Sequence, residues 1–192
     1  MNNSQASQAA ALSESPQNPL YDRYASRQMA RIFSAKNRFG NWRKMWIALA
    51  ECQRELGLEI TDEQIADLKK VETHIDLERV AELEASTRHD VVAHLRHFAE
   101  LAGPAGGILH LGATSAFITD NTDVLLTREA LTLIRQRLAA VIANLARFAE
   151  RTQAIPALAY THFQPAQLTT VGKRACLWIQ DFVEDLHEIE HR

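Results

Sequence analysis

The stretch DNTDVLLTREALTLIRQRLAAVIANLARFAER, residues 120–151, decides the fold class of this chain. Its apolar residues recur at a three-four spacing over about eight turns, which indicates one amphipathic helix about 45 Å long. The residues of this stripe are Val124, Leu131, Ile134, Leu138, Val141, Leu145 and Phe148. Leu126, Leu133 and Ile142 widen the apolar surface beyond one stripe. Because a lone two-helix hairpin could not cover that surface, the pattern predicts a larger helical bundle.

A second long helix is expected after the break at Ile155-Pro156. Its apolar positions in helical register are Val171, Ala175, Trp178, Phe182, Leu186 and Ile189. The pattern is still in phase at Arg192, and no Gly, Asn or Pro stop signal has occurred by then. We therefore expect the sequence to be a truncated piece of a longer chain.

Shorter helices are predicted before the long stretch. The first is marked by Met29, Ile32 and Phe33; a second begins near Asn41 as N-cap and is closed by Gly57. A third helix is expected to start at the capping box Thr61/Gln64, and residues 76–85 are expected to form a fourth helix. The cap spacing of Thr87 and Asp90 predicts the start of a fifth helix, which ends at Gly103-Pro104. The expected fold is all-α: a disordered tail over residues 1–19, a small helical N-terminal domain over 20–111, and the start of a central helical-bundle domain over 112–192.

Composition excludes several classes of protein. The 192 residues are 46% hydrophobic with only 7 Gly and 5 Pro, which favours long helices. A net charge of −3 gives no overall basic field for nucleic acid or for an anionic membrane. The first 19 residues contain no Lys or Arg and lack the features of a signal or transit peptide, so a cytoplasmic protein is expected. Cys52 and Cys176 lie in apolar helical patterns, where we interpret them as small buried residues rather than a disulfide, although two cysteines leave both open.

Arg88-His89-Asp90 is the first candidate site, at a predicted helix start. Exposed amides and the positive end of the helix dipole favour an anion there, and Arg88 would add a bidentate donor. The alternative, favoured by the spacing alone, is a capped helix with solvated charges.

The turn before the long helix, His110-Leu-Gly-Ala-Thr-Ser115, is the second candidate. The hydroxyls of Thr114 and Ser115 could donate to a phosphate or carboxylate, but plain N-capping is the commonest use of such residues.

Two further candidates lie towards the ends of the chain. His162, in a loop with Thr161 and Gln164, suits proton transfer because imidazoles exchange protons near neutral pH; a histidine bonded only to backbone is the equal alternative. The neighbouring Arg23 and Tyr24 could clamp a phosphate or decorate the surface.

A metal site is not expected. His94 and His97 share a helical face with each other and follow His89, but no carboxylate or Cys stands at a ligand-like spacing.

Six segments together resemble the adenylosuccinate lyase family of the fumarase/aspartase superfamily. They are RYAS (23–26), NWRKMW (41–46), TRHDVVAH (87–94), HLGATS (110–115), DNTD (120–123) and THFQPAQLTTVGKR (161–174). The resemblance runs from about residue 19 to 192. The Thr-His-x-Gln element is shared across the superfamily, whereas its combination with Arg-His-Asp-Val narrows the match to this branch.

The resemblance implies a three-domain helical fold and a homotetramer in which three subunits share each active site. It implies that His162 is the general acid that protonates the departing nitrogen and that His89, flanked by Arg88 and Asp90, orients the substrate. It also implies that residues like Thr114 and Ser115 bind the succinyl part and that the pair Arg23 and Tyr24 contacts the nucleotide phosphate. No metal or organic cofactor is implied.

The implied reaction is β-elimination of fumarate from adenylosuccinate and from the succinylated aminoimidazole carboxamide ribotide. A proton next to a carboxylate is removed, and hydroxyl and cationic donors stabilise the charge that develops there. The carbon–nitrogen bond then breaks more easily when the nitrogen is protonated.

One departure from the family matters. The family's catalytic base is a serine on a Gly/Ser-rich loop followed by Met-Pro-x-Lys, and no such motif occurs in this sequence. We therefore expect the 192-residue chain alone to be inactive. Other interpretations remain: a sibling such as argininosuccinate lyase, a non-catalytic truncated helical interaction module, or a metal-binding helical protein.

Overall fold

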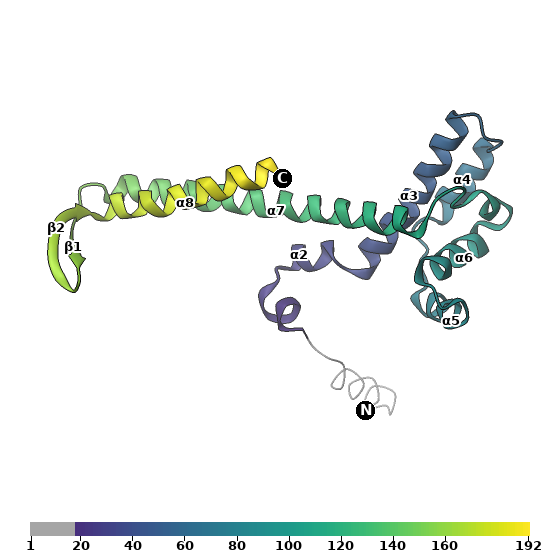
Figure 1. Cartoon of the computed structure of the whole chain (residues 1–192), viewed down its shortest axis with the longest axis horizontal. Helices are drawn as coiled ribbons and strands as arrows, with labels where there is room; N and C mark the ends of the chain where they lie inside the picture. The colour runs from purple at the N-terminus through teal and green to yellow at the C-terminus, as the bar shows by residue number, and fades with distance from the viewer. Residues whose placement is uncertain (1–17) are drawn as a thin grey trace, which may run out of the picture. The chain divides into compact units, whose positions relative to one another are not determined.

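A computed structural model describes residues 18–192, which divide into two units between Leu126 and Thr127 (Figure 1). The predicted disordered tail lies outside the described residues except for its last two positions. The first unit contains a series of helical elements and the start of a long helix. These are η1 (Leu20–Tyr24), α2 (Arg27–Ile32), α3 (Ala35–Glu55), α4 (Asp62–Val71), α5 (Leu77–Thr87), α6 (Asp90–Ala102), η2 (Gly103–Ile108) and α7 (Ser115–Thr152).

Several helix ends follow the expected chemistry. Thr61 and Gln64 form the reciprocal capping box at the start of α4. Asp76 caps α5 by accepting from the amides of Glu78 and Arg79. Gly57, at φ 93°, follows the end of α3, as predicted for a residue that stops a helix.

One predicted helix start and one predicted helix cap are wrong. The second helix begins at Ala35, not near Asn41, because Ser34 accepts a hydrogen bond from the amide of Asn37 at 3.3 Å and caps the helix two turns earlier. A helix does begin at Asp90, as the Thr87/Asp90 spacing predicted, but Thr87 is not its cap. Thr87 ends α5 and donates to the carbonyl of His89, which is itself the N-cap of α6 and makes no side-chain cap bond.

The core of the first unit gathers around α3, α4 and α6. Trp46, Leu68 and Phe98 have no exposed surface, and Ile118 from the start of α7 joins the same cluster. Burial on this scale is the main favourable term in folding. Arg43 is also buried, 1% exposed, and its guanidinium donates to His97 Nδ1 at 2.7 Å and to the carbonyl of Val71 at 2.9 Å.

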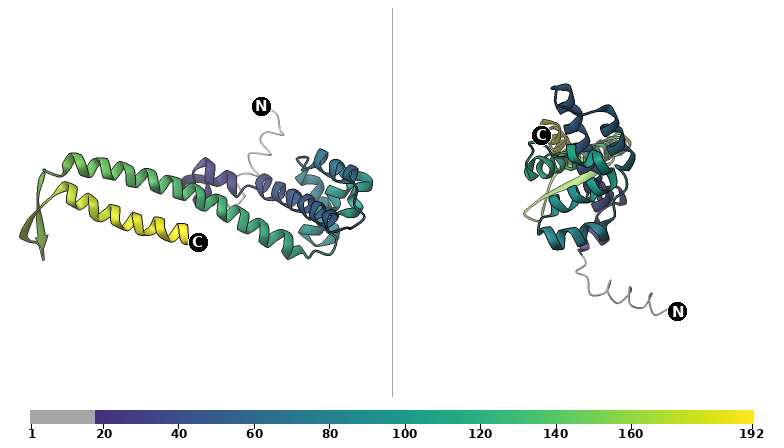
Figure 2. Two further views of the ribbon diagram at one scale, coloured as in Figure 1. Left: turned by 90° about the horizontal axis from the view of Figure 1, so that it is seen from above. Right: turned by 90° about the vertical axis from the view of Figure 1, so that its right-hand side faces the viewer.

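The second unit consists of the remainder of α7, a β-hairpin and α8 (Val171–His191). Figures 1 and 2 show α8 running back beside the C-terminal half of α7. The two helices come closest at Gly172, where an added Cβ would lie 2.5 Å from the carbonyl oxygen of Ala149. The second long helix is thus confirmed, and the long stretch is helical from Ser115, more than a turn before the predicted start at Asp120.

The hairpin was not predicted. Strands β1 (Pro156–Thr161) and β2 (Gln164–Thr170) pair antiparallel where a plain loop was expected. Tyr160 and Thr161 in β1 and Thr169 and Thr170 in β2 are aromatic or β-branched residues that favour strands. The mainly helical fold class is confirmed, with this two-stranded sheet as the exception.

Burial of the cysteines was predicted wrongly, since Cys52 and Cys176 are both free and exposed. Each lies on a helix whose apolar face is formed by other residues. Among the described residues, no helix is long and apolar enough to cross a membrane.

Candidate active site

The first unit brings three of the predicted site residues together. His89, the N-cap of α6, and Ser115, the first residue of α7, are joined by a 3.2 Å contact between His89 Nε2 and Ser115 Oγ. On the other side of the imidazole, Nδ1 lies 3.2 Å from Asp90 Oδ1. Residues 26 positions apart in the sequence therefore form one polar cluster.

This cluster stands where two helices begin. The first-turn amides of a helix lack intrahelical acceptors, and the helix dipole places partial positive charge there. Because both α6 and α7 begin at the His89–Ser115 contact, both helix ends favour an anion at this place. A carboxylate or a phosphate is the chemical class of ligand that this arrangement suits.

The Asp90 carboxylate orients the imidazole of His89 through Nδ1. It accepts a hydrogen bond from the amide of Val91 at 2.7 Å, which fixes its position at the first turn of α6. With Asp90 accepting from Nδ1–H, the His89 Nε2 is left to accept from the Ser115 hydroxyl or to meet a ligand. The single proton of the Ser115 hydroxyl can be donated either to His89 Nε2 or to a bound carboxylate.

Thr114 precedes Ser115 in the chain, and Arg88 precedes His89. Thr114 Oγ1 accepts from the amide of Phe117 at 3.4 Å, so it caps α7 as the simpler interpretation had it. Arg88 adopts the left-handed conformation, φ 54°, between α5 and α6. Arg88 lines a shallow hollow with Ala81, Glu84 and Ala85 of α5.

His162 belongs to the second unit, at the tip of the hairpin. Thr161 pairs with Gln164, so His162 and Phe163 form a two-residue turn, with φ values of 50° and 60°. Such turns strongly favour Asn and Gly, because a side chain strains the left-handed conformation. The Phe163 side chain is fully exposed. Strain of this kind is often found at functional sites.

Arg23 and Tyr24 lie in η1, near the start of the described residues, and both are exposed. Tyr24 is 75% exposed, so its phenol is accessible to a ligand. Within residues 18–192, no side-chain hydrogen bond or ion pair joins either residue to the His89 cluster.

The histidines that invited a metal interpretation belong to the core. His94 is stacked 3.8 Å from the ring of Phe39, and burial, helped by the charge of Arg43, lowers its pKa to about 4. Burial lowers the pKa of His97 as well, and the neighbouring guanidinium of Arg43 adds to that effect. Neutral rings are the forms that such surroundings favour. In the described part of the chain, no group of three or more His, Cys, Asp or Glu residues could hold a metal.

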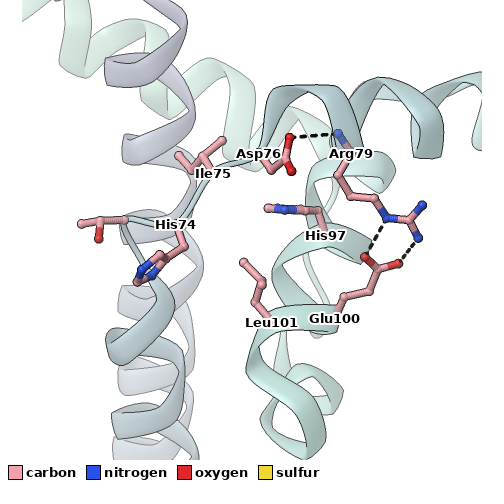
Figure 3. Close-up of a pocket in the computed structure, with 8 residues that line it drawn as sticks. His74, Ile75, Asp76, Arg79, His97, Glu100 and Leu101 are labelled. Carbon is pink, nitrogen blue, oxygen red and sulfur yellow. Dashed lines mark hydrogen bonds and ion pairs between the residues drawn. The ribbon is translucent and has the colours of Figure 1, made fainter.

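A hollow of about 500 Å³ beside His97 is not the predicted site (Figure 3). The charged groups that line it already have partners. Arg79 donates to both carboxylate oxygens of Glu100, at 2.8 and 3.1 Å, and Asp76 caps α5. These pairs stabilise the packing of α5 on α6 rather than offer free groups to a ligand.

Comparison with known proteins decides the family. A family model described as lyase matches residues 16–192. The chain belongs to this lyase family. The lyase chain is 50% identical over 175 residues to adenylosuccinate lyase of Saccharomyces cerevisiae and 45% identical over 177 residues to that of Schistosoma mansoni. These matches cover 90% and 92% of this chain, but it spans only 36% and 37% of the relatives' lengths.

Solved structures agree with the family. The lyase chain superposes on a fumarate lyase from Mesorhizobium sp. BNC1 with a TM-score of 0.80 and 30% identity, over 90% of this chain and 41% of that one. A 3-carboxy-cis,cis-muconate lactonizing enzyme from Pseudomonas putida gives the same TM-score at 24% identity, which shows a shared fold alone.

Sequence reasoning missed two residues that support the site of the lyase chain. Trp46 and Gln53, both on α3, donate hydrogen bonds to the turn that precedes Ser115. In the sequence, Trp46 stood out only as the end of the segment 41–46, and in the structure its side chain is fully buried. Its hydrogen bond joins residues 64 positions apart, and no local spacing signals such a contact.

Proposed function

We propose that this chain supplies part of the active site of an adenylosuccinate lyase. The reaction is β-elimination of fumarate from adenylosuccinate, giving AMP, and from the succinylated aminoimidazole carboxamide ribotide of purine nucleotide biosynthesis. The observation that carries the proposal is the His89–Ser115 contact where α6 and α7 begin, a place suited to a carboxylate. Identity of 45–50% to curated adenylosuccinate lyases supports it.

In this proposal, the hydroxyls of Ser115 and Thr114 donate to the succinyl group. The elimination places extra negative charge on the carboxylate beside the carbon that loses its proton. Donors fixed at two helix ends stabilise that charge without having to reorganise during the reaction. His89 orients the substrate, and Asp90 holds the imidazole through Nδ1. Arg88, which directly precedes His89, flanks this group.

His162 is the proposed general acid, which protonates the nitrogen as its bond to the succinyl carbon breaks. Its place at the tip of a hairpin, followed by an exposed Phe163, presents the imidazole outward. The exposed Arg23 and Tyr24 are proposed to contact the nucleotide phosphate. No metal or organic cofactor takes part in these steps.

We propose that the complete enzyme is a cytoplasmic homotetramer whose active sites are shared between subunits. Residues 112–192 would begin its central bundle and residues 20–111 its N-terminal domain. Exposed apolar side chains on the long helices support this: Ile134 and Val141 are 41% exposed, and Leu177 and Trp178 more than half. The two free cysteines suit a reducing compartment.

A hybrid subunit tests the function. Residues 18–192 replace the matching segment of the Saccharomyces cerevisiae adenylosuccinate lyase, and fumarate release is measured from adenylosuccinate and from argininosuccinate. The proposal predicts release from adenylosuccinate only. Release from argininosuccinate alone would favour the sibling enzyme. A folded, tetrameric hybrid that releases fumarate from neither substrate would favour a non-catalytic interaction module.

The isolated chain provides the matching test. Because the family's serine-bearing loop is absent from the sequence, the purified 192-residue chain should release no fumarate. Steady release by the chain, with its mass verified as intact, would show that the reaction needs less of the family's machinery than proposed.

A further inference from the structure

The turn that leads into α7 has an unfavourable backbone. Between η2 and α7, His110 adopts φ 63° and Gly112 φ 65°. Glycine enters this region freely, but a residue with a side chain does so only when its surroundings hold it there. Within the turn, the amide of Ala113 donates to the carbonyl of His110 at 3.3 Å, a long bond. The conformation of the turn therefore depends on contacts from outside it.

Helix α3 provides those contacts. The indole Nε1–H of Trp46 donates to His110 Nδ1 at 3.0 Å, and the amide nitrogen of Gln53 donates to the carbonyl of Leu111 at 2.7 Å. Trp46 and Gln53 are seven residues apart, about two helical turns, and so lie on one face of α3. Two donors on one rigid helix thus fix two successive residues of the turn.

Ser115 follows this turn directly, and its hydroxyl meets His89 at 3.2 Å. The geometry points to Trp46 and Gln53 as positioning residues for the reaction, which hold the turn so that the Thr114 and Ser115 hydroxyls face the substrate carboxylate beside His89. This inference rests on the proposed function for its chemistry. A hydroxyl displaced by a fraction of an ångström stabilises the developing charge less, although neither α3 residue touches the substrate.

A comparison with Trp42 distinguishes the positioning role of Trp46 from its contribution to core packing. Trp42, one turn earlier on α3, is 2% exposed, and its Nε1 is buried without a hydrogen-bond partner. Both indoles fill the core, but only that of Trp46 reaches the turn. The Trp46 bond also selects one form of His110, because Nδ1 must be unprotonated to accept it. Burial lowers the pKa of His110, which favours the same neutral ring.

Nuclear magnetic resonance of the 192-residue chain tests the positioning directly. The imidazole ¹⁵N shifts of His89 and His110 are recorded for Trp46→Phe and for its matched control Trp42→Phe. We expect Trp46→Phe to lose the single His110 tautomer, to raise the pH at which His110 titrates, and to shift the His89 ring. Trp42→Phe should leave both rings as they are. Unchanged His89 shifts in Trp46→Phe would overturn the inference.

A second pair of variants covers the case in which Trp46→Phe fails to fold. Gln53→Met removes the donor to Leu111 at a half-buried position, whereas Gln53→Lys keeps a donor of similar reach. We expect Gln53→Met to shift the His89 ring and Gln53→Lys to restore it. Equal His89 shifts in the two variants would contradict a positioning role for Gln53.

Kinetics of the hybrid subunit extend the test to the reaction. Trp46→Phe and Gln53→Met should each lower kcat roughly tenfold, the loss expected for one hydrogen bond of ordinary strength, with a smaller change in KM. Gln53→Lys and Trp42→Phe should stay near the parent rate. An inactive parent hybrid would count against the proposed function. The nuclear magnetic resonance experiment would still test whether Trp46 and Gln53 position the turn. Unchanged kcat in both donor-deleting variants of an active hybrid would overturn it.

Discussion

Replacing Arg43 by Met should destabilise the first unit more than any exposed arginine substitution. The guanidinium is 1% exposed and lies 4.4 Å from the centre of the Phe98 ring. It donates to His97 Nδ1 and to the carbonyl of Val71, and so ties α3 to α6 and to the end of α4. Met has a similar length and fills most of the space, so the change removes chiefly the donors and the charge.

The size of the loss follows from opposing effects. One buried acceptor, His97 Nδ1, is left without a donor, which costs about 1–3 kcal/mol. The Val71 carbonyl keeps the amide of His74 as a donor at 3.1 Å. The lost cation–π contact adds about 1–2 kcal/mol. Burial lowers the pKa of Arg43 to about 10, which shows that the charge is unfavourably placed, and removing it recovers part of the loss. We expect a net loss of about 2 kcal/mol, which corresponds to roughly 4–8 °C in Tm.

Urea unfolding followed by circular dichroism and tryptophan fluorescence measures this loss. Arg96→Met, an exposed change on α6, is the matched control and should stay within about 0.5 kcal/mol of the parent. The double variant Arg43→Met/His97→Phe also removes the orphaned ring nitrogen, so it should be less destabilised than the sum of its single changes. A loss below about 1 kcal/mol for Arg43→Met, or strict additivity in the double variant, would contradict this role of Arg43.

Three further predictions concern other parts of the chain. Because the pKa of His94 is lowered to about 4 in the folded chain, the unfolded chain protonates this imidazole at a higher pH. The free energy of unfolding should therefore fall as the pH drops from about 6.5 to 4. His94→Gln should flatten this dependence in urea titrations, and an unchanged slope would contradict it. Gly172→Ala should destabilise the packing of α8 on α7 by about 1–3 kcal/mol. Gly107→Ala, where no atom lies near the added Cβ, should leave stability unchanged. Equal urea midpoints for the two variants would contradict this prediction. Phe163→Gly should relieve the left-handed strain at the hairpin and slow hydrogen exchange of its strand amides by roughly two- to fivefold, since about 0.5–1 kcal/mol is gained; faster exchange would speak against that strain.

The sequence predicted the helical fold well where local chemistry controls it. The three-four spacing before Arg151 and the Thr61/Gln64 capping box both correspond to observed helices. The start of α3 was missed because Ser34 and Asn41 are equally good caps by residue type. The contacts of Phe39 with Trp42 and His94, which favour the earlier start, are not evident from local sequence. The hairpin around His162 was missed because a turn of His and Phe at positive φ contradicts local preference.

The residues of the candidate site could be predicted from the sequence, but the hydrogen bonds that hold the neighbouring turn could not. Motif resemblance pointed to His89 and Ser115, and the fold brings them into contact across 26 residues. The bonds from Trp46 and Gln53 to the turn span 64 and 58 residues, so only the three-dimensional structure reveals them. Burial of the cysteines was mispredicted for a related reason. An apolar neighbourhood in sequence does not specify which face of a helix a residue occupies.

The most direct measurement is the rate of fumarate release by the hybrid subunit carrying His162→Gln. We expect kcat to fall by roughly 10²–10⁴, because no other group would protonate the departing nitrogen. The exposed-histidine control His187→Gln should keep the parent rate. A His162→Gln hybrid that releases fumarate as fast as the parent would contradict the assignment of His162 as the proton donor.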